Sequence, residues 1–261
     1  MDISGLIVPP TTPFGKGGDI DEGRYAAHLE FLAEKGVTRL LVNGTTAEFF
    51  SLLPSERLSL LKITKKYFPG TIFFNTASDS LRQAKETARR AADYGAHALV
   101  AMTPYYFAGA PEEGLVAFFN ELGSCIDIPL ILYNFSRHTN NPITPGILKK
   151  VKHVAIKDSS GDYSLIKNTP CYLSGTSRNM VEGHLAGAKG FVSSLANVVP
   201  ELYVSLEKSL KKDDVEGALL LQEEIKASCA KIPAGNEISW IKKELSAIIK
   251  SYPASVRIPL I

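Results

Sequence analysis

A single lysine, Lys157, stands at the end of a predicted buried strand, where its amine could act as a nucleophile. It follows the apolar run Val154–Ile156, so its side chain is expected to project from the top of that strand. An amine held in a dry site is displaced toward its neutral form, which attack on a ketone requires. The alternative is a lysine that pairs with neighbouring Asp158 at a rim, because most lysines are solvated surface charges.

Small hydroxyl side chains follow another predicted strand. Gly44, Thr45 and Thr46 come directly after the apolar run Leu40–Val42. Glycine lets the backbone approach a ligand closely, and turn amides with two hydroxyls suit a small carboxylate. The alternative is a capped turn that leads into the next helix.

Aromatic hydroxyls offer proton-transfer groups, but their pattern leaves the role open. Tyr133 ends a strand, where it is either a proton relay or a buried residue with a satisfied hydroxyl, and the run Tyr105–Phe107 leaves the same choice.

Other chemistries have little support. The five histidines form no short ligand pair for zinc, and the glycine-rich run Phe14–Gly18 fits neither nucleotide-binding pattern, so we expect a surface turn there.

Eight strands that alternate with helices would bring these residues together. Short apolar runs bounded by Gly, Pro or Asn are typical of buried parallel strands. Eight such units favour an α/β fold of the (β/α)8 TIM barrel type over a doubly wound sheet, and the active sites of such barrels lie at the carboxyl ends of the strands. The predicted strands are Gly5–Pro9, Arg39–Asn43, Thr71–Asn75, Ala98–Met102, Pro129–Asn134, Val154–Asp158, Tyr172–Gly175 and Gly190–Ser193.

Helix signals complete the pattern. Ser80 and Gln83 have the spacing of a capping box, and Thr144 before Pro145 indicates a helix start. No linker rich in Pro, Gly or Ser divides the chain, so we predict a barrel over residues 1–212 and a C-terminal helical extension over 213–261 as one structural unit. The predicted helices include Glu22–Lys35, Ser80–Tyr94, Pro200–Lys211, Asp214–Lys231 and Asn236–Lys250.

The composition is that of an ordinary globular protein, with 45% hydrophobic and 21% charged residues among 261. A net charge of +2 offers no basic surplus for nucleic acid, and no uncharged apolar run approaches the roughly 18 residues that span a bilayer. The start lacks the pattern of a signal peptide, and three scattered cysteines predict neither a disulfide framework nor a metal knuckle. We therefore expect a cytoplasmic protein without nucleic-acid or membrane partners.

Five segments, in order, resemble the dihydrodipicolinate synthase/N-acetylneuraminate lyase superfamily from about residue 5 to Pro259. The resemblance implies a pyruvate-handling lyase that works through a lysine imine, with a 2-oxo acid substrate, no metal, no other cofactor and a homotetrameric assembly. The matching segments are Pro10–Phe14, Val42–Glu48, Thr103–Tyr106, Leu132–Asn134 and Ile156–Asp158.

The same resemblance assigns roles within the site. Lys157 would condense with the ketone, and Tyr133 would move protons during imine formation and carbon–carbon cleavage. Thr45 would join the proton relay and, with Thr46, hold the pyruvate carboxylate. The other implied site residues are Tyr106, which would complete the relay across a subunit interface, Gly44 in the carboxylate-holding turn, and Gly175 and Val192, which would line the site through backbone atoms.

One segment departs from the lysine-pathway synthases of the superfamily, which carry Tyr-Asn-x-Pro-x-Arg-Thr and hold aspartate semialdehyde with that arginine. Here Ser136 replaces the proline, His138 fills the arginine position and Arg137 stands one residue early. The Val-Asn-Gly-Thr-Thr phrase and the Lys157-Asp158 pair look more like archaeal 2-keto-3-deoxygluconate aldolases, some of which accept the 6-phosphate. Arg137 or His138 would contact such a phosphate. Family members usually continue with more helix beyond the C-terminal Arg-x-Pro segment, whereas this sequence has only a short stretch there. The resemblance therefore implies the usual tetramer contacts less firmly than it implies the barrel site.

The resemblance implies, as the leading hypothesis, a class I aldolase that cleaves 2-keto-3-deoxy sugar acids to pyruvate and glyceraldehyde. The alternatives are 4-hydroxy-tetrahydrodipicolinate synthase and a dehydratase of keto-deoxy sugar acids that uses the same imine. A non-catalytic keto-acid-binding protein is disfavoured because Lys157, Tyr133 and Thr45 are all present.

Overall fold

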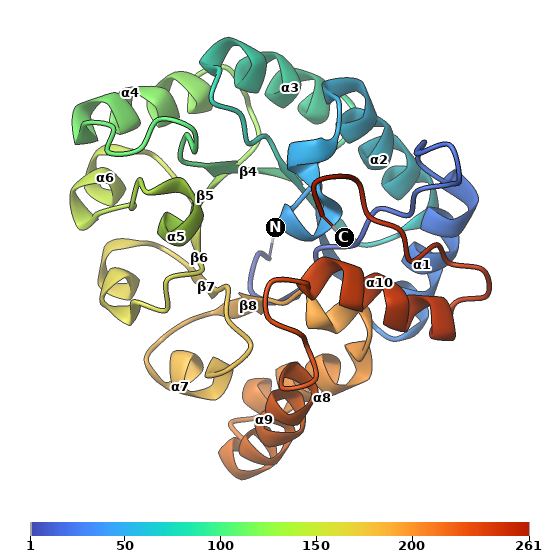
Figure 1. Ribbon diagram of the computed structural model, residues 1–261. Helices are drawn as coiled ribbons and strands as arrows, with labels where there is room; N and C mark the ends of the chain where they lie inside the picture. The colour runs from blue at the N-terminus through green and yellow to red at the C-terminus, as the bar shows by residue number, and fades with distance from the viewer. Residues whose placement is uncertain (1, 261) are drawn as a thin grey trace.

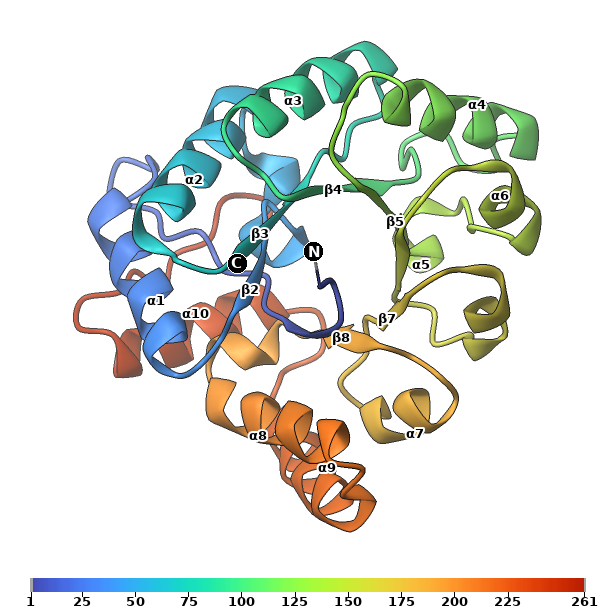
Figure 2. The ribbon, with the colours of Figure 1, turned by 180° about the vertical axis from the view of Figure 1, so that it is seen from behind.

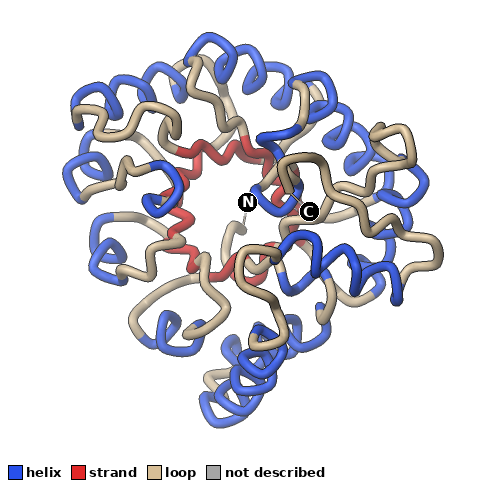
Figure 3. The backbone as a smooth tube through the Cα atoms, in the orientation of Figure 1, coloured by secondary structure: helices blue, strands red, loops and turns tan. Residues whose placement is uncertain are grey.

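Eight parallel strands form the centre of the computed structural model, which describes residues 2–260. The strands pair in the order β1-β8-β7-β6-β5-β4-β3-β2, and a parallel bridge between Val8 and Leu40 joins the first strand to the second. The strands therefore form a ring surrounded by helices (Figures 1 and 3). The predicted (β/α)8 barrel is confirmed. The strands are β1 Gly5–Ile7, β2 Arg39–Val42, β3 Thr71–Asn75, β4 Ala98–Met102, β5 Leu130–Asn134, β6 Ala155–Asp158, β7 Tyr172–Ser174 and β8 Gly190–Val192.

Helices follow the strands, and several begin where the sequence predicts. Thr144 Oγ1 accepts a hydrogen bond from the Ile147 amide at 3.2 Å, and Ser80 Oγ accepts from the Gln83 amide at 3.3 Å. The capping box at Ser80 is only half formed, because the Gln83 side chain bonds Ser78 instead. The helices are α1 Glu22–Glu34, α2 Pro54–Tyr67, α3 Leu81–Asp93, α4 Glu112–Gly123, α5 Ser136–Thr139, α6 Pro145–Lys150, α7 Met180–Leu185, α8 Pro200–Lys211, α9 Val215–Cys229 and α10 Glu237–Ile248, with 3-10 turns η1 Thr45–Ala47, η2 Phe49–Ser51, η3 Tyr163–Asn168 and η4 Leu195–Asn197.

The core has two layers because strand side chains alternate between the two faces of the sheet. In β2, for example, Leu40 and Val42 pack outward against the helices, whereas Leu41 belongs to the cluster inside the barrel. In β6, Ala155 faces the interior, so Lys157, two residues further, emerges on the same face at the carboxyl end. The apolar side chains inside the barrel therefore lie directly below Lys157.

The C-terminal helices extend beyond the barrel. Helix α9 packs beside α8, α10 contacts η4, and the chain after α10 crosses in front of the turns that follow β2 (Figure 1; Figure 2 gives the opposite side). A separate apolar cluster contains Ile241, Leu245, Ile249 and Tyr252, with Phe31 of α1 packed against it. Among residues 2–260, no helix is long and apolar enough to cross a membrane.

Candidate active site

Lys157 and Tyr133 are paired residues on neighbouring strands. They stand opposite each other in the parallel register of β5 and β6, so both side chains leave the sheet on its inner face. Lys157 Nζ lies 3.6 Å from the centroid of the Tyr133 ring and 5.6 Å from that of Phe135. Lys157 is only 8% exposed, and its amine forms no ion pair with any residue in the described range 2–260.

Asp158 is not the partner of this amine. The alternation of the strand carries its side chain to the opposite face, where it is fully buried. Its carboxylate accepts hydrogen bonds from Asn134 Nδ2 at 2.7 Å and from the hydroxyls of Ser160 and Tyr172 at 2.7 and 2.5 Å. Burial and this carboxylate raise the pKa of Tyr172 well above its usual value of 10. The alternative of a Lys157–Asp158 rim pair is therefore wrong.

Ser159 contacts the lysine, a feature that the sequence analysis missed. Lys157 Nζ donates to Ser159 Oγ at 2.9 Å. The spacing of two residues at a strand end was the available signal, because residues i and i+2 share a face.

Gly175 is required by the same packing. A Cβ at this position would stand 2.3 Å from Ser159 Oγ, 2.9 Å from the Asp158 carbonyl and 3.0 Å from Lys157 Cε. The end of β7 passes so close to the lysine that only a glycine fits without movement. Sequence reasoning named Gly175 from the resemblance, and the packing supplies a physical reason for it.

Thr45 connects the turn after β2 to the tyrosine. Its Oγ1 lies 3.4 Å from the Tyr133 hydroxyl, so that lysine, tyrosine and threonine form one contiguous series. Thr46, in the same 3-10 turn, is buried. Gly44 precedes the turn with φ −76°, and a Cβ there would meet Pro9 at an ordinary 3.4 Å, so the protein itself does not require glycine.

The remaining predicted site residues lie farther from the amine. Val192 belongs to the interior cluster of the barrel. Arg137 and His138 are exposed on α5 and contact Phe135, at 5.7 Å for the guanidinium and 4.2 Å for the imidazole ring. Burial and the neighbouring arginine lower the pKa of His138. Tyr106 is 88% exposed and makes no side-chain contact with Tyr133 within residues 2–260.

The Phe14–Gly18 run forms the predicted turn, closed by a bridge between Phe14 and Ile20, although the Phe14 ring is buried. Within the described residues, no three His, Cys, Asp or Glu side chains gather where they could hold a metal ion.

Comparison with known proteins places this geometry in a family. Residues 2–261 match the dihydrodipicolinate synthetase family. The chain belongs to that family. A 4-hydroxy-tetrahydrodipicolinate synthase from Methanopyrus kandleri is 32% identical over 242 residues, which cover 86% of this chain and 80% of the relative. One from Staphylococcus haemolyticus is 30% identical over 218 residues, covering 78% and 74%.

A solved structure extends the comparison to another activity. A variant of the 2-keto-3-deoxygluconate aldolase from Sulfolobus solfataricus superposes with a TM-score of 0.89 at 25% identity, covering 98% of this chain and 89% of the aldolase. The superfamily inferred from the sequence motifs is thus confirmed, and the family member described here is a lyase of the aldolase type.

Proposed function

We propose that this protein is a class I aldolase that cleaves 2-keto-3-deoxygluconate, and its 6-phosphate, reversibly to pyruvate and glyceraldehyde or its phosphate. The observation that supports the proposal best is the placement of Lys157 Nζ on the face of Tyr133, whose hydroxyl meets Thr45. This series joins a nucleophile to a proton-transfer group at the carboxyl end of the barrel, where the chemistry of such folds occurs.

The reaction begins with attack of the Lys157 amine on the ketone carbon, and loss of water gives a protonated imine. Tyr133 then accepts the proton of the C4 hydroxyl and passes it toward Thr45. The C3–C4 bond breaks, its electron pair enters the imine to give an enamine, and the aldehyde leaves. Protonation at C3 and addition of water release pyruvate and restore the amine. The imine itself is the electron sink, so these steps call for no metal or organic cofactor.

The substrate carboxylate is assigned to the turn after β2. Thr45 and Thr46 offer hydroxyl and backbone donors beside the buried Lys157, which suits an anion held through hydrogen bonds. The sugar tail would extend toward α5, where Arg137 offers a cation for a terminal phosphate. His138 is a weaker candidate because burial and the neighbouring Arg137 lower the pKa of its ring and so disfavour the charged form.

The second candidate is 4-hydroxy-tetrahydrodipicolinate synthase, which is the name of both relatives cited above. The aldolase is favoured because Arg137 is exposed on α5, 5.7 Å from the Phe135 ring centroid, and His138 fills the place of the synthase arginine. A synthase would need one of these cations to reach the carboxylate of aspartate semialdehyde beside Lys157.

A second copy of the chain would complete the site. The backbone amides of Tyr105 and Tyr106 donate to Asp79 Oδ1 at 2.6 and 2.9 Å, so the loop is anchored while the Tyr106 ring points outward. We assign this ring to the proton relay of a neighbouring subunit in a homotetramer. Light scattering of the Tyr106→Ala variant, with activity measured in parallel, tests the assignment.

The experiment that tests the function is product analysis. The purified protein is incubated with 2-keto-3-deoxygluconate, and pyruvate and glyceraldehyde are quantified separately, with Lys157→Met as the matched control. The proposal expects equal amounts of both products from the wild type and none from the control. Loss of water without glyceraldehyde would indicate the dehydratase, and turnover only of pyruvate with aspartate semialdehyde would indicate the synthase.

A further inference from the structure

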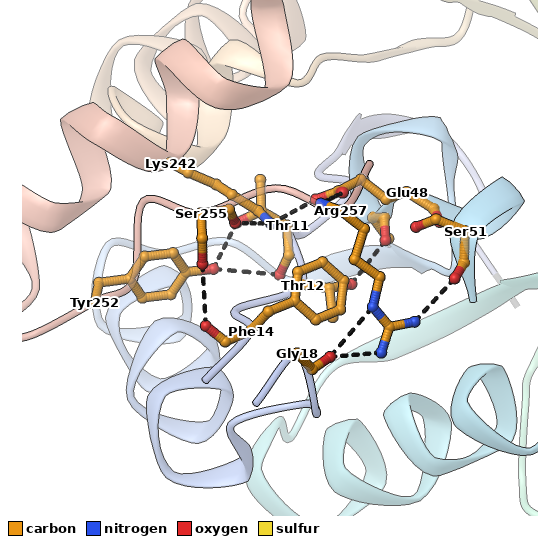
Figure 4. A network of polar contacts seen from close by, with 11 residues as sticks. Thr11, Thr12, Phe14, Gly18, Glu48, Ser51, Lys242, Tyr252, Ser255 and Arg257 are labelled. Atoms are coloured by element: carbon orange, nitrogen blue, oxygen red, sulfur yellow. Dashed lines mark hydrogen bonds and ion pairs between the residues drawn. The ribbon is translucent and has the colours of Figure 1, made fainter. Parts of the chain in front are cut away.

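A buried ion pair outside the reacting groups joins the C-terminal extension to the turn after β2. Glu48 follows η1, and Lys242 lies in α10; both side chains are fully buried, and Lys242 Nζ contacts Glu48 Oε1 (Figure 4). The ammonium also donates to the Ser255 carbonyl at 2.8 Å and lies 4.3 Å from the Phe14 ring centroid. Burial lowers the pKa of Lys242 to about 8, and Glu48 opposes that shift.

The second carboxylate oxygen of Glu48 is also bound by a residue of the C-terminal extension. The Arg257 amide donates to Glu48 Oε2 at 2.8 Å. The Arg257 guanidinium donates to the carbonyls of Ser51 and Gly18, at 2.8 and 2.7 Å, and pairs with Glu56. Both oxygens of Glu48 are therefore held by residues close to the C-terminus, and the guanidinium extends the attachment to the chain after Glu48.

The backbone of Glu48 makes this attachment relevant to the active site. Glu48 has φ +59°, an uncommon left-handed conformation for a residue with a long side chain, and its amide donates to the Thr45 carbonyl at 3.0 Å. Such a conformation persists where surrounding contacts determine it. On the other side of the turn, Thr12 Oγ1 donates to the Ala47 carbonyl at 2.8 Å.

A role in stability alone does not account for the pair. Buried ion pairs contribute little net stability compared with apolar residues of similar size, because desolvation offsets the attraction. What this pair does provide is a fixed position for a carboxylate three residues from Thr45, whose hydroxyl lies 3.4 Å from that of Tyr133.

We infer that Glu48 is a positioning residue: held by Lys242 and Arg257, it fixes the Thr45–Ala47 turn so that the Thr45 hydroxyl faces Tyr133. The C-terminal extension is thus part of the active-site architecture. The kinetic consequences rest on the proposed aldolase function, whereas the ordering of the turn does not.

The test uses pairs of variants that leave no unpaired buried charge. Glu48→Ala/Lys242→Met removes the ion pair and every side-chain bond from residue 48. Glu48→Gln/Lys242→Met removes the charges but keeps an acceptor for the Arg257 amide. We expect kcat/KM to fall at least about tenfold in the alanine pair and to return to within about threefold of wild type in the glutamine pair. Thermal unfolding of each variant confirms that the assay temperature lies below its transition.

A structural role is separated from a positioning role by two further variants. Glu207→Ala breaks the partly buried contact with Arg39 at the opposite end of β2, and should lower the melting temperature while leaving kcat/KM unchanged. In a Thr45→Val background, the alanine pair should lower kcat/KM by much less than it does in the wild type, because Glu48 acts chiefly through Thr45. Wild-type kcat/KM in the alanine pair, or an undiminished loss in the Thr45→Val background, would overturn the inference.

Hydrogen exchange keeps this inference independent of the proposed function. Peptides that cover residues 44–52 should exchange faster in the alanine pair, with those of β4 and β5 unchanged. Unchanged exchange at 44–52 would overturn the inference even in an active aldolase. Failure of the wild type to form an imine with pyruvate would refute the proposed function and leave the exchange result to decide the role of Glu48.

Discussion

Replacement of Gly175 by alanine should slow imine formation at Lys157 while leaving the barrel folded. The new Cβ would stand 2.3 Å from Ser159 Oγ and 3.0 Å from Lys157 Cε, so the serine hydroxyl must move by about 1 Å and the lysine by a few tenths. The Asp158 carbonyl, 2.9 Å away, belongs to the backbone and cannot rotate aside. Overpacking of this kind costs about 1–3 kcal/mol of unfolding free energy.

The catalytic effect follows from the displacement of the nucleophile. Misplacement of a reacting group by about 1 Å costs roughly 100-fold, and the smaller shift of Lys157 itself indicates a loss of about 10- to 100-fold. The assay is the rate at which pyruvate and borohydride label Lys157, followed by intact mass, together with urea unfolding. Ser159→Ala/Gly175→Ala should recover part of the loss, because it removes the closest contact.

Gly114→Ala is the matched control. This glycine lies in α4, and nothing stands within 4 Å of its added Cβ. Alanine there should leave labelling unchanged and raise stability by about 0.5–1 kcal/mol, as is usual in a helix. Wild-type labelling and stability in Gly175→Ala would refute the packing argument.

Three other outcomes are expected. Tyr133→Phe keeps the ring beneath Lys157 but loses the hydroxyl near Thr45, so imine labelling should slow and cleavage should fall by about 10²- to 10⁴-fold; wild-type rates of labelling and cleavage would contradict a relay role. Arg137→Ala should leave cleavage of 2-keto-3-deoxygluconate within about threefold and raise KM only for the 6-phosphate, measured by pyruvate release; abolished condensation with aspartate semialdehyde would instead support the synthase. Burial lowers the pKa of His28 to about 3, and both ring nitrogens lack partners within the described residues. Below pH 6.5 this histidine is therefore protonated in the unfolded chain but not in the folded chain. The free energy of unfolding should fall as the pH drops from 6.5 toward 3, by up to about 1.4 kcal/mol per pH unit. His28→Phe should flatten that dependence in urea titrations, and parallel pH profiles for the two proteins would show that the loss arises elsewhere.

The strands were predictable because strands buried on both faces appear in the sequence as short apolar runs. Thr71–Asn75 and Ala98–Met102 have the predicted bounds, and the other strands differ by one or two residues at their ends. Their order also placed Lys157 and Tyr133 at one end of the barrel, since parallel strands align their carboxyl ends. The helix at Glu22 followed from apolar spacing, and the helix starts after Ser80 and Thr144 followed from their caps.

Contacts between distant segments were not predictable. Glu48 and Lys242 are 194 residues apart, and nothing in either local pattern indicates that the two charges are buried together. The left-handed backbone at Glu48, whose carboxylate accepts from the Arg257 amide, likewise has no signal in the local sequence. The role of Tyr106 stays a prediction because its ring is exposed at the surface of its own chain.

Borohydride trapping with 2-keto-3-deoxygluconate as the only substrate tests the central claim most directly. The account predicts a reduced pyruvate adduct on Lys157, identified by intact mass and a peptide map, which records imine formation and carbon–carbon cleavage together. A free pyruvate control should give the same adduct. If neither compound labels Lys157 in folded protein, the imine mechanism is contradicted; if only pyruvate does, the choice of substrate is contradicted.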